Sequence, residues 1–198
     1  MTLIDSDVDG RRLRRTNNRE AVLDALGELF TEGNYEPSTS EIADRAGLSL
    51  RSLFRYFDDV DDLYRAAIER ALDAARPLLD VGVGPDAVTA TKVHHVVAAR
   101  MRLYDRIEPA ARAARVCAHR HDVVAAQIAE SRSFLRHQLA RLFAPELRGS
   151  AGAARLAAAD ALLSFESYQL LRHAQRLSRP KTAAVLTDAL GALLGAAS

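Results

Sequence analysis

Residues 38–57 of this 198-residue chain read STSEIADRAGLSLRSLFRYF, and this stretch decides the fold. Ser38 can cap a first helical turn, and Glu41, three residues later, can reach back to the cap, which predicts a helix start. Gly47 tolerates the left-handed conformation that ends such a helix, and Ser49 can cap a second one. Two short helices joined by a glycine-containing turn are typical of a helix-turn-helix.

The second of these helices, residues 50–57, is the part that we expect to touch DNA. In a helix-turn-helix the second helix enters the major groove, and its first residues reach base edges. Arginine fits a guanine edge with two parallel hydrogen bonds, and small hydroxyls at a helix N-terminus suit phosphate oxygens. The expected buried side of the motif is Ile42, Ala43, Leu48, Leu53 and Phe57. The exposed side of the second helix is Leu50, Arg51, Ser52, Arg55 and Tyr56.

The run from Ser40 to Phe57 resembles the DNA-binding domain of the TetR family of transcriptional regulators, and the likeness extends over residues 16–72. The resemblance implies a homodimeric repressor whose C-terminal helical domain binds a small molecule and dimerises through its last two helices. It also places Thr39 and Ser40 near backbone phosphates. The resulting DNA-binding set is Thr39, Ser40, Ser49, Leu50, Arg51, Ser52, Phe54, Arg55 and Tyr56.

Two positions depart from the pattern of that family. Phe54 stands where the family often has a tyrosine whose hydroxyl meets a phosphate, and Val60 stands where it usually has a lysine. An acidic cluster (residues 58–62) surrounds Val60, so we expect weakened phosphate contacts. A basic arm (residues 11–19) without any acid could offset this loss by neutralising phosphates or entering the minor groove. A solvated, disordered tail is an equally good interpretation of the arm.

Composition indicates an all-α protein. Lysines and arginines number 27 against 26 acids, which excludes a uniformly basic nucleic-acid coat protein. Abundant alanine, leucine and arginine favour helices, and 48% hydrophobic residues exclude a disordered chain. We expect a disordered basic arm over residues 1–15, a helix-turn-helix DNA-binding domain with its linking helix over 16–76, and a larger helical ligand-binding and dimerisation domain over 77–198.

Apolar periodicity and prolines predict the remaining helices. One helix is expected over residues 16–31 and another over 60–76, followed by a loop from Pro77 to Pro85. Pro109 is read as a helix boundary, because proline suits a first turn but not an interior. The helices expected beyond the loop lie near residues 86–104, 108–117, 120–143, 151–176 and 179–196.

The larger domain must supply the regulatory input. In helix bundles, ligand sites form between helices from apolar residues and a few polar ones. The candidate ligand-binding residues are His95, Met101, Tyr104, His121, Phe134, Phe165 and Tyr168. Leucines alternating with small residues over 151–196 predict a close-packed homodimer interface about a two-fold axis, and hence a palindromic operator.

Other classes of function find little support. The six histidines show no H-x-x-x-H spacing, so we expect no metal and no cofactor, although a metal sensor stays open. The single Cys117 is most simply a small buried hydrophobe, since redox sensing would require exposure and a depressed pKa. Without a signal peptide or an apolar run of about 20 residues, a cytoplasmic protein with no membrane partner is expected. No catalytic motif is present, so the protein is not expected to be an enzyme.

The sequence therefore predicts a sequence-specific transcriptional regulator. It is expected to be a repressor that a small-molecule ligand releases from double-stranded operator DNA. The alternative is a helical interaction protein that keeps the fold but has weak or no DNA binding, which Val60 and the acidic cluster would favour.

Overall fold

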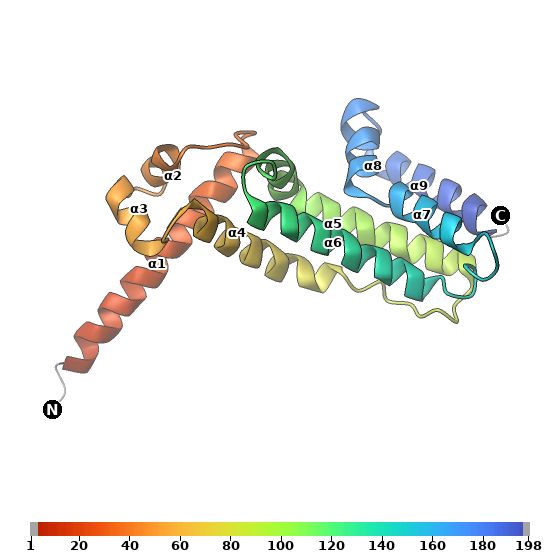
Figure 1. Ribbon diagram of the computed structural model, residues 1–198, viewed down its shortest axis with the longest axis horizontal. Coiled ribbons are helices and arrows are strands. Elements are labelled where there is room, and N and C mark those ends of the chain that lie inside the picture. The colour runs from red at the N-terminus through yellow and green to blue at the C-terminus, as the bar shows by residue number, and fades with distance from the viewer. Residues whose placement is uncertain (1–3, 196–198) are drawn as a thin grey trace. The chain divides into compact units, whose positions relative to one another are not determined.

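The computed structural model describes residues 4–195, with side chains from Arg14 onward, and within these bounds every regular element is a helix (Figure 1). The predicted all-α fold is thus confirmed. The chain forms two compact units. The first comprises the residues up to 73 together with 108–128, and the second comprises 74–107 together with the residues from 129 onward.

The first unit is built on the helix-turn-helix. It holds α1 (Ile4–Thr31), α2 (Thr39–Arg45), α3 (Leu50–Tyr56), most of α4 (Val60–Ala75), the end of α5 (Thr89–Cys117) and the start of α6 (Asp122–Leu142). Its core draws on all six helices, and burying each large aliphatic side chain contributes about 1.5–3 kcal/mol. Core residues include Val22, Leu26, Ile42, Leu53, Leu63, Ala113, Cys117 and Val124.

The ends of α2 and α3 are formed by the predicted caps. The Glu41 backbone N–H donates to Ser38 Oγ (3.2 Å), and the Ser38 N–H donates to Glu41 Oε2 (2.8 Å), which completes a capping box. The Ser52 N–H donates to Ser49 Oγ (3.2 Å) at the start of α3. Gly47, in the turn between them, has a φ of 69°, a conformation that favours glycine. The local prediction for residues 38–57 is confirmed.

The N-terminal segment differs from its prediction. We expected disorder over residues 1–15, yet α1 begins at Ile4 and continues without a break to Thr31. This stretch holds no proline, and extending a helix that is already nucleated farther along the chain costs less than starting a new one. Residues 1–3 and the side chains of Arg11 and Arg12 lie outside the described part.

The predicted division at residue 77 also differs from the two units. Residues 108–128 pack into the first unit, because Ala113, Cys117 and Val124 are buried in its core. Pro109 was predicted to begin a helix but lies inside α5. The residues of α5 on either side of it are buried in different units, and this burial outweighs the single backbone hydrogen bond that proline removes.

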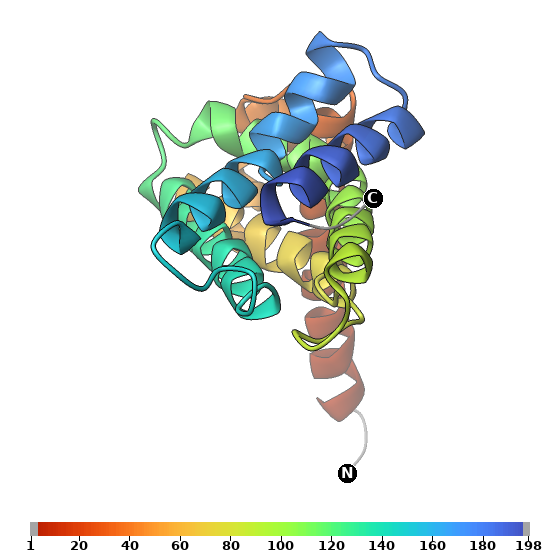
Figure 2. The same cartoon turned by 90° about the vertical axis from the view of Figure 1, so that its right-hand side faces the viewer.

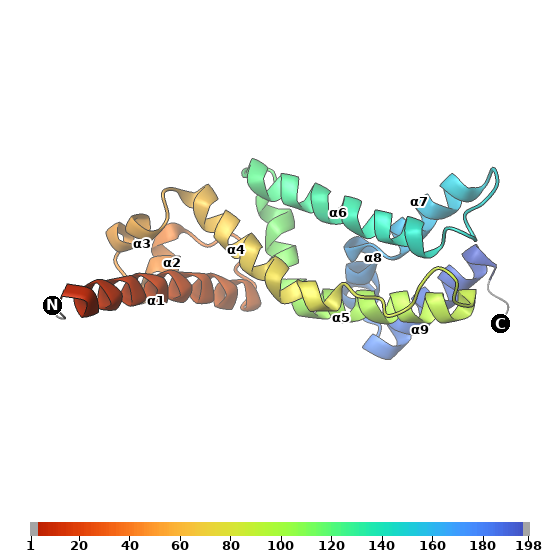
Figure 3. The same cartoon turned by 90° about the horizontal axis from the view of Figure 1, so that it is seen from below.

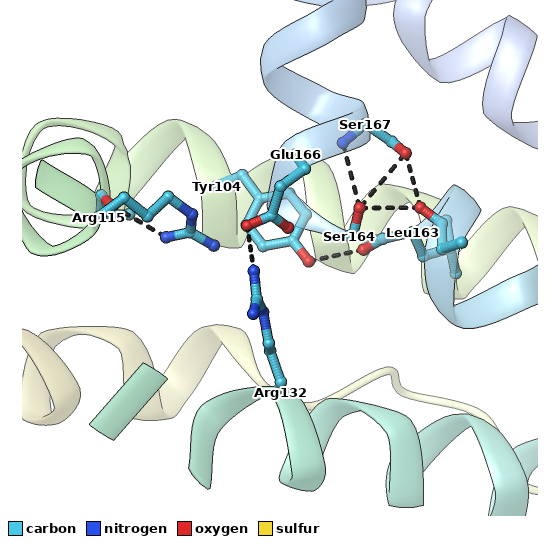
Figure 4. Close-up of polar contacts among 9 residues, drawn as sticks. Tyr104, Arg115, Arg132, Leu163, Ser164, Glu166 and Ser167 are labelled. Carbon is cyan, nitrogen blue, oxygen red and sulfur yellow. Dashed lines mark hydrogen bonds and ion pairs between the residues drawn. The ribbon is translucent and has the colours of Figure 1, made fainter. Parts of the chain in front are cut away.

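The expected helix over residues 151–176 is interrupted. Instead, α7 (Gly152–Leu162) is followed by α8 (Phe165–Gln169) and the π-helical turn η2 (Leu170–Ala174). Figure 4 shows the cause. Ser164 is extended and its Oγ accepts from the Ser167 N–H (3.1 Å), while the Leu163 carbonyl accepts from the Tyr104 hydroxyl (2.6 Å). A cap and a tertiary bond thus replace the helical bond between residues 167 and 163.

The second unit packs α7 beside α9 (Arg179–Leu194), as Figure 2 shows, together with parts of α5 and α6. A short 3₁₀ turn, η1 (Arg76–Leu78), leads into a loop that runs back along α5 (Figure 3). Lys92, which is 1% exposed, donates to the Pro85 carbonyl (2.8 Å) and lies 2.6 Å from Glu146 Oε1. The loop is therefore anchored to α5 by a buried cation.

Candidate nucleic-acid interface

The recognition helix of the motif, α3, has one buried and one exposed side. Leu53 and the adjoining Phe57 are fully buried against the core of the first unit. Leu50 and Phe54 are each 43% exposed, Arg51 and Arg55 are exposed, and Ser52 and Tyr56 are half-buried. The two-sided character predicted for residues 50–57 is present, and the residues predicted to meet DNA lie on the exposed side. Of the predicted buried side, Leu48 alone is half-buried rather than buried.

An open cavity of about 380 Å³ is lined by residues of α1 and α3. These two helices contact each other (Figure 1). The lining residues are Arg14, Arg15, Asn18, Arg55 and Tyr56. The Tyr56 hydroxyl accepts from Asn18 Nδ2 (2.7 Å) and from an Arg55 guanidinium nitrogen (2.7 Å). These donors, helped by the charges of Arg55 and Arg15, lower the pKa of Tyr56. We call these five residues the arginine cavity.

Sequence reasoning missed the role of Asn18 in this arrangement. The basic arm was recognised, and so was the exposed side of α3, but nothing in their separate patterns joined them. The available signal was helical spacing, because residues 14, 15 and 18 share one face of a helix that begins before Arg14.

Two of the hydroxyls at the helix starts, those of Ser49 and Ser52, are engaged in local bonds. Ser49 Oγ caps α3 and lies 3.0 Å from Ser52 Oγ, so these two predicted phosphate contacts also stabilise the motif itself. Thr39 is half-buried and Ser40 is exposed at the start of α2. All four side chains lie at the N-terminal ends of α2 and α3.

The acidic cluster is a capping structure. The Asp62 N–H donates to Asp59 Oδ1 (2.7 Å), and the Asp58 N–H donates to Asp62 Oδ2 (3.2 Å). Asp61 Oδ1 lies 2.6 Å from His121 Nδ1. Val60 is half-buried against the core, which explains an apolar side chain at that position. Acids in the first turn of α4 are also favoured by its dipole.

The structure brings together four of the predicted ligand-binding residues. The rings of Tyr104, Phe165 and Tyr168 lie 5.5–5.8 Å apart between centroids, and all three are buried. Met101, also buried, precedes Tyr104 on α5 by one helical turn. The Tyr168 hydroxyl donates to Asp105 Oδ1 (2.9 Å), and beside this cluster Arg132 pairs with Glu166 at 2.5 Å (Figure 4). Within this cluster the hydroxyls of Tyr104 and Tyr168 each donate to an oxygen of the same unit.

The other three predicted residues are not part of this cluster. His95 is exposed, with its Nδ1 3.2 Å from the Val81 carbonyl, and Phe134 on α6 is 50% exposed. His121 belongs to the first unit, where it contacts Asp61. Spacing along the chain could not reveal this, because residues 108–128 pack with the helix-turn-helix.

Cys117 lies in an environment opposite to that of a redox sensor. Its side chain is buried, its Sγ donates to the Tyr35 carbonyl (3.2 Å), and it lies 3.5 Å from the Tyr64 hydroxyl. Burial raises the pKa of this thiol. Within the described residues, no three His, Cys, Asp or Glu side chains are grouped so that they could hold a metal ion. In the same part of the chain, no helix is long and apolar enough to cross a membrane.

The motif agrees with a known family. The family model described as bacterial regulatory proteins, tetR family, matches residues 22–67, from within α1 to within α4. Residues 22–67 thus match the DNA-binding domain of the TetR family, and the comparisons support a TetR-family transcriptional regulator. The TetR family consists of DNA-binding regulators and not of enzymes, which agrees with the expectation from the sequence.

Individual relatives of this TetR-family chain are distant. It is 38% identical over 65 residues to the HTH-type transcriptional activator FasR of Mycolicibacterium smegmatis, a match that covers 32% of this chain and 30% of FasR. A transcriptional regulator from Rhodococcus sp. Rha1 superposes with a TM-score of 0.69 at 19% identity, over 89% of this chain and 96% of that one. A TetR-family regulator from Streptomyces coelicolor gives 0.61 at 24% identity, over 88% and 81%. These structures show a shared fold.

Proposed function

We propose that this TetR-family protein binds operator DNA through α3 and represses transcription until a small molecule binds its second unit. The observation that carries the proposal is a capped recognition helix that buries Leu53 and exposes Arg51. Among the described residues, the Arg51 side chain makes no hydrogen bond or ion pair, so its guanidinium is available to a base edge. A bidentate contact to guanine would discriminate between bases by about 1–3 kcal/mol.

A gel-shift experiment tests this proposal directly. The full chain is titrated against DNA from upstream of its own gene and against unrelated DNA of equal length, at two salt concentrations. Selective retention of the upstream DNA, weakening as salt rises, supports an operator-binding regulator. No retention at either salt supports the alternative, a helical interaction protein that has kept only the fold.

Dimerisation would come from residues 151–196, of which residue 196 lies outside the described part. Support comes from the packed pair α7 and α9, beside which Leu170 is 53% exposed and Val185 43% exposed. An apolar dimer interface over these elements would bury both side chains. Truncation after Ser178 should yield monomers or aggregates in light scattering, whereas a well-behaved dimer would refute the interface. A symmetric dimer in turn requires a palindromic operator.

Release of the protein from its operator requires a small molecule that binds the DNA-bound and the DNA-free conformations with different affinity. The cluster of Met101, Tyr104, Phe165 and Tyr168 supplies the apolar and polar groups that such a site needs. The test is the operator complex itself, challenged with a panel of apolar small molecules. A compound that releases the DNA from the wild-type protein but not from Tyr104→Phe would locate the ligand at this cluster.

Activation is the second candidate, because the relative FasR is named an activator. A promoter with the upstream operator, fused to a reporter gene, separates the two. Expression that falls when the protein is present indicates repression, and expression that rises indicates activation.

A further inference from the structure

Arg100 is a buried cation inside the second unit. It lies on α5 and is 1% exposed. Its Nη1 donates to Gln138 Oε1 (2.7 Å) and its Nη2 donates to the Leu135 carbonyl (3.2 Å), so α6 supplies both acceptors. Both acceptors are neutral, and no carboxylate of the described residues contacts the guanidinium. The positive charge of Arg100 is therefore buried without an anion beside it.

The carboxylate whose charge reaches Arg100 is engaged with another arginine. Burial lowers the pKa of Arg100, because the loss of water outweighs the attraction of Asp160. Asp160 Oδ2 itself accepts from Arg136 Nη1 (3.2 Å). A buried charge is costly unless it is paired and hydrogen-bonded. An anion that enters from outside the unit would supply the missing charge.

Arg100 also keeps hydrogen-bonding capacity. A guanidinium carries five N–H donors. The Nε of Arg100 is buried, and within the described part of the chain its N–H has no acceptor. Buried polar groups of native proteins are nearly always hydrogen-bonded, so an exception calls for a partner. Arginine binds a carboxylate with two parallel N–H donors, and Nε can be one of them. The unpartnered Nε thus favours a carboxylate as that partner.

An aromatic cluster adjoins this cation on the same helix. Arg100 and Tyr104 are four residues apart on α5 and hence share one face of it. Tyr104 is also one of the groups that act electrostatically on Arg100. The rings of Phe165 and Tyr168 each lie 5.5 Å from the Tyr104 ring between centroids. A ligand that spans one helical turn of α5 would therefore meet a cation at one end and aromatic rings at the other.

We propose that the small molecule bound by the second unit is a carboxylic acid with an apolar body. Its carboxylate pairs with Arg100, and its body packs on the aromatic cluster beside Tyr104. The inference rests on the proposed function and deepens it, because it gives the ligand a chemical class and assigns it a residue that sequence analysis did not select. One arginine balances one negative charge, so a monoanion suits this site better than a doubly charged phosphate monoester.

Isothermal titration calorimetry of the full chain, without DNA, tests the chemical class. The probes are benzoate, phenylacetate and octanoate, each compared with the uncharged amide of the same acid, and phenyl phosphate. At least one of the acids should bind the wild type, and its amide should bind at least about 30-fold more weakly, because the amide leaves the buried cation unpaired. Phenyl phosphate should bind more weakly than phenylacetate.

Two variants test the residue. Arg100→Gln removes the cation and should weaken binding of the acid by at least about 30-fold, while the affinity of the amide stays unchanged. Gln138→Glu keeps Arg100 but places a carboxylate where the Gln138 amide now accepts from it, so the acid should again bind more weakly. The matched control is Arg102→Gln, the same substitution at an exposed position of α5, which should bind the acid like the wild type. Circular dichroism checks the folding of each variant, and Gln138→Glu decides the question if Arg100→Gln does not fold.

The outcomes separate this inference from the proposed function. If an acid binds as expected but does not release the operator in a gel shift, the ligand class stands and ligand-controlled release fails. If the amides bind as tightly as the acids, or if Gln138→Glu binds the acid like the wild type, the anion site is wrong. Tighter binding of phenyl phosphate would overturn the carboxylate. Failure of every acid to bind at millimolar concentration would also overturn the inference and leave Arg100 a structural residue held by Gln138.

Discussion

His121 Nδ1 lies 2.6 Å from Asp61 Oδ1, which ties the residue before α6 to the first turn of α4. The His121 ring also lies 4.6 Å from the Tyr64 ring between centroids. Because α4 directly follows α3, these contacts hold the recognition helix's neighbour to residues far along the chain. They assign a structural role to a histidine that spacing alone suggested for ligand binding.

Replacing His121 should therefore reduce stability. His121→Ala removes the partner of Asp61 and a ring contact of Tyr64, and should lower the free energy of unfolding by about 1–2 kcal/mol. Urea denaturation measures the change. His94→Ala, at an exposed position on α5, is the control and should stay within about 0.5 kcal/mol of the wild type. Equal free energies of unfolding for the two variants would contradict a structural role of His121.

Gly152 marks a close approach of two backbone segments. A Cβ at this position would lie 1.8 Å from the Leu147 carbonyl oxygen, so Gly152→Ala must displace backbone. We expect a loss of about 1–3 kcal/mol. Gly27→Ala, in open space on α1, should instead stabilise the protein by about 0.5–1 kcal/mol. Thermal denaturation followed by circular dichroism should shift in opposite directions for the two variants.

The ion pair of Lys92 and Glu146 should make the free energy of unfolding depend on pH in acid solution. Burial alone would raise the pKa of Glu146, but hydrogen bonds from Lys92 and Thr89 outweigh it and hold this pKa below its ordinary value of 4.5. A lowered pKa contributes stability that is present above pH 4.5 and is lost as pH falls through the folded-state value. The wild type should thus weaken in this acid range more steeply than Glu146→Gln.

Breaking this pair at neutral pH should also be costly. Either Glu146→Gln or Lys92→Met leaves one group buried without its partner, which costs about 3–5 kcal/mol. Chemical denaturation at pH 7 measures the loss. A double variant that loses much less than the sum of the two single variants would demonstrate the coupling, and strict additivity would contradict it.

Cys117 should be unreactive in the folded protein. Its thiol is buried and its pKa is raised, so the reactive thiolate is scarce at neutral pH. Modification by a thiol-specific reagent should proceed only at the rate of unfolding. The same protein, unfolded in guanidinium chloride, should react completely soon after the reagent is added. Rapid labelling under native conditions would reopen the redox interpretation.

The helix-turn-helix could be predicted because its information is local. Ser38 and Glu41 bond to each other across three residues, Ser49 caps its own helix, and Gly47 is needed where φ is positive. Each signal can be recognised within one or two turns of chain. The exposed side of α3 follows from helical periodicity in the same way.

The remaining features depend on contacts between distant residues. Pro109 stays inside a helix because both sides of it are buried, and Ser164 starts a new helix where Tyr104 has taken the Leu163 carbonyl. The bond from Asn18 to Tyr56 spans 38 residues. Periodicity locates each residue on its own helix but does not say which helix it will meet, so the arginine cavity could not be predicted.

The discontinuous make-up of the first unit limits how the protein can be recombined. A chimaera that transplants only the first 76 residues would leave behind Ala113, Cys117 and Val124, and would expose the apolar surface that they cover. A transplanted first unit must therefore also include residues 108–128. The two units of this protein are consequently not modules that recombine at a single crossover point.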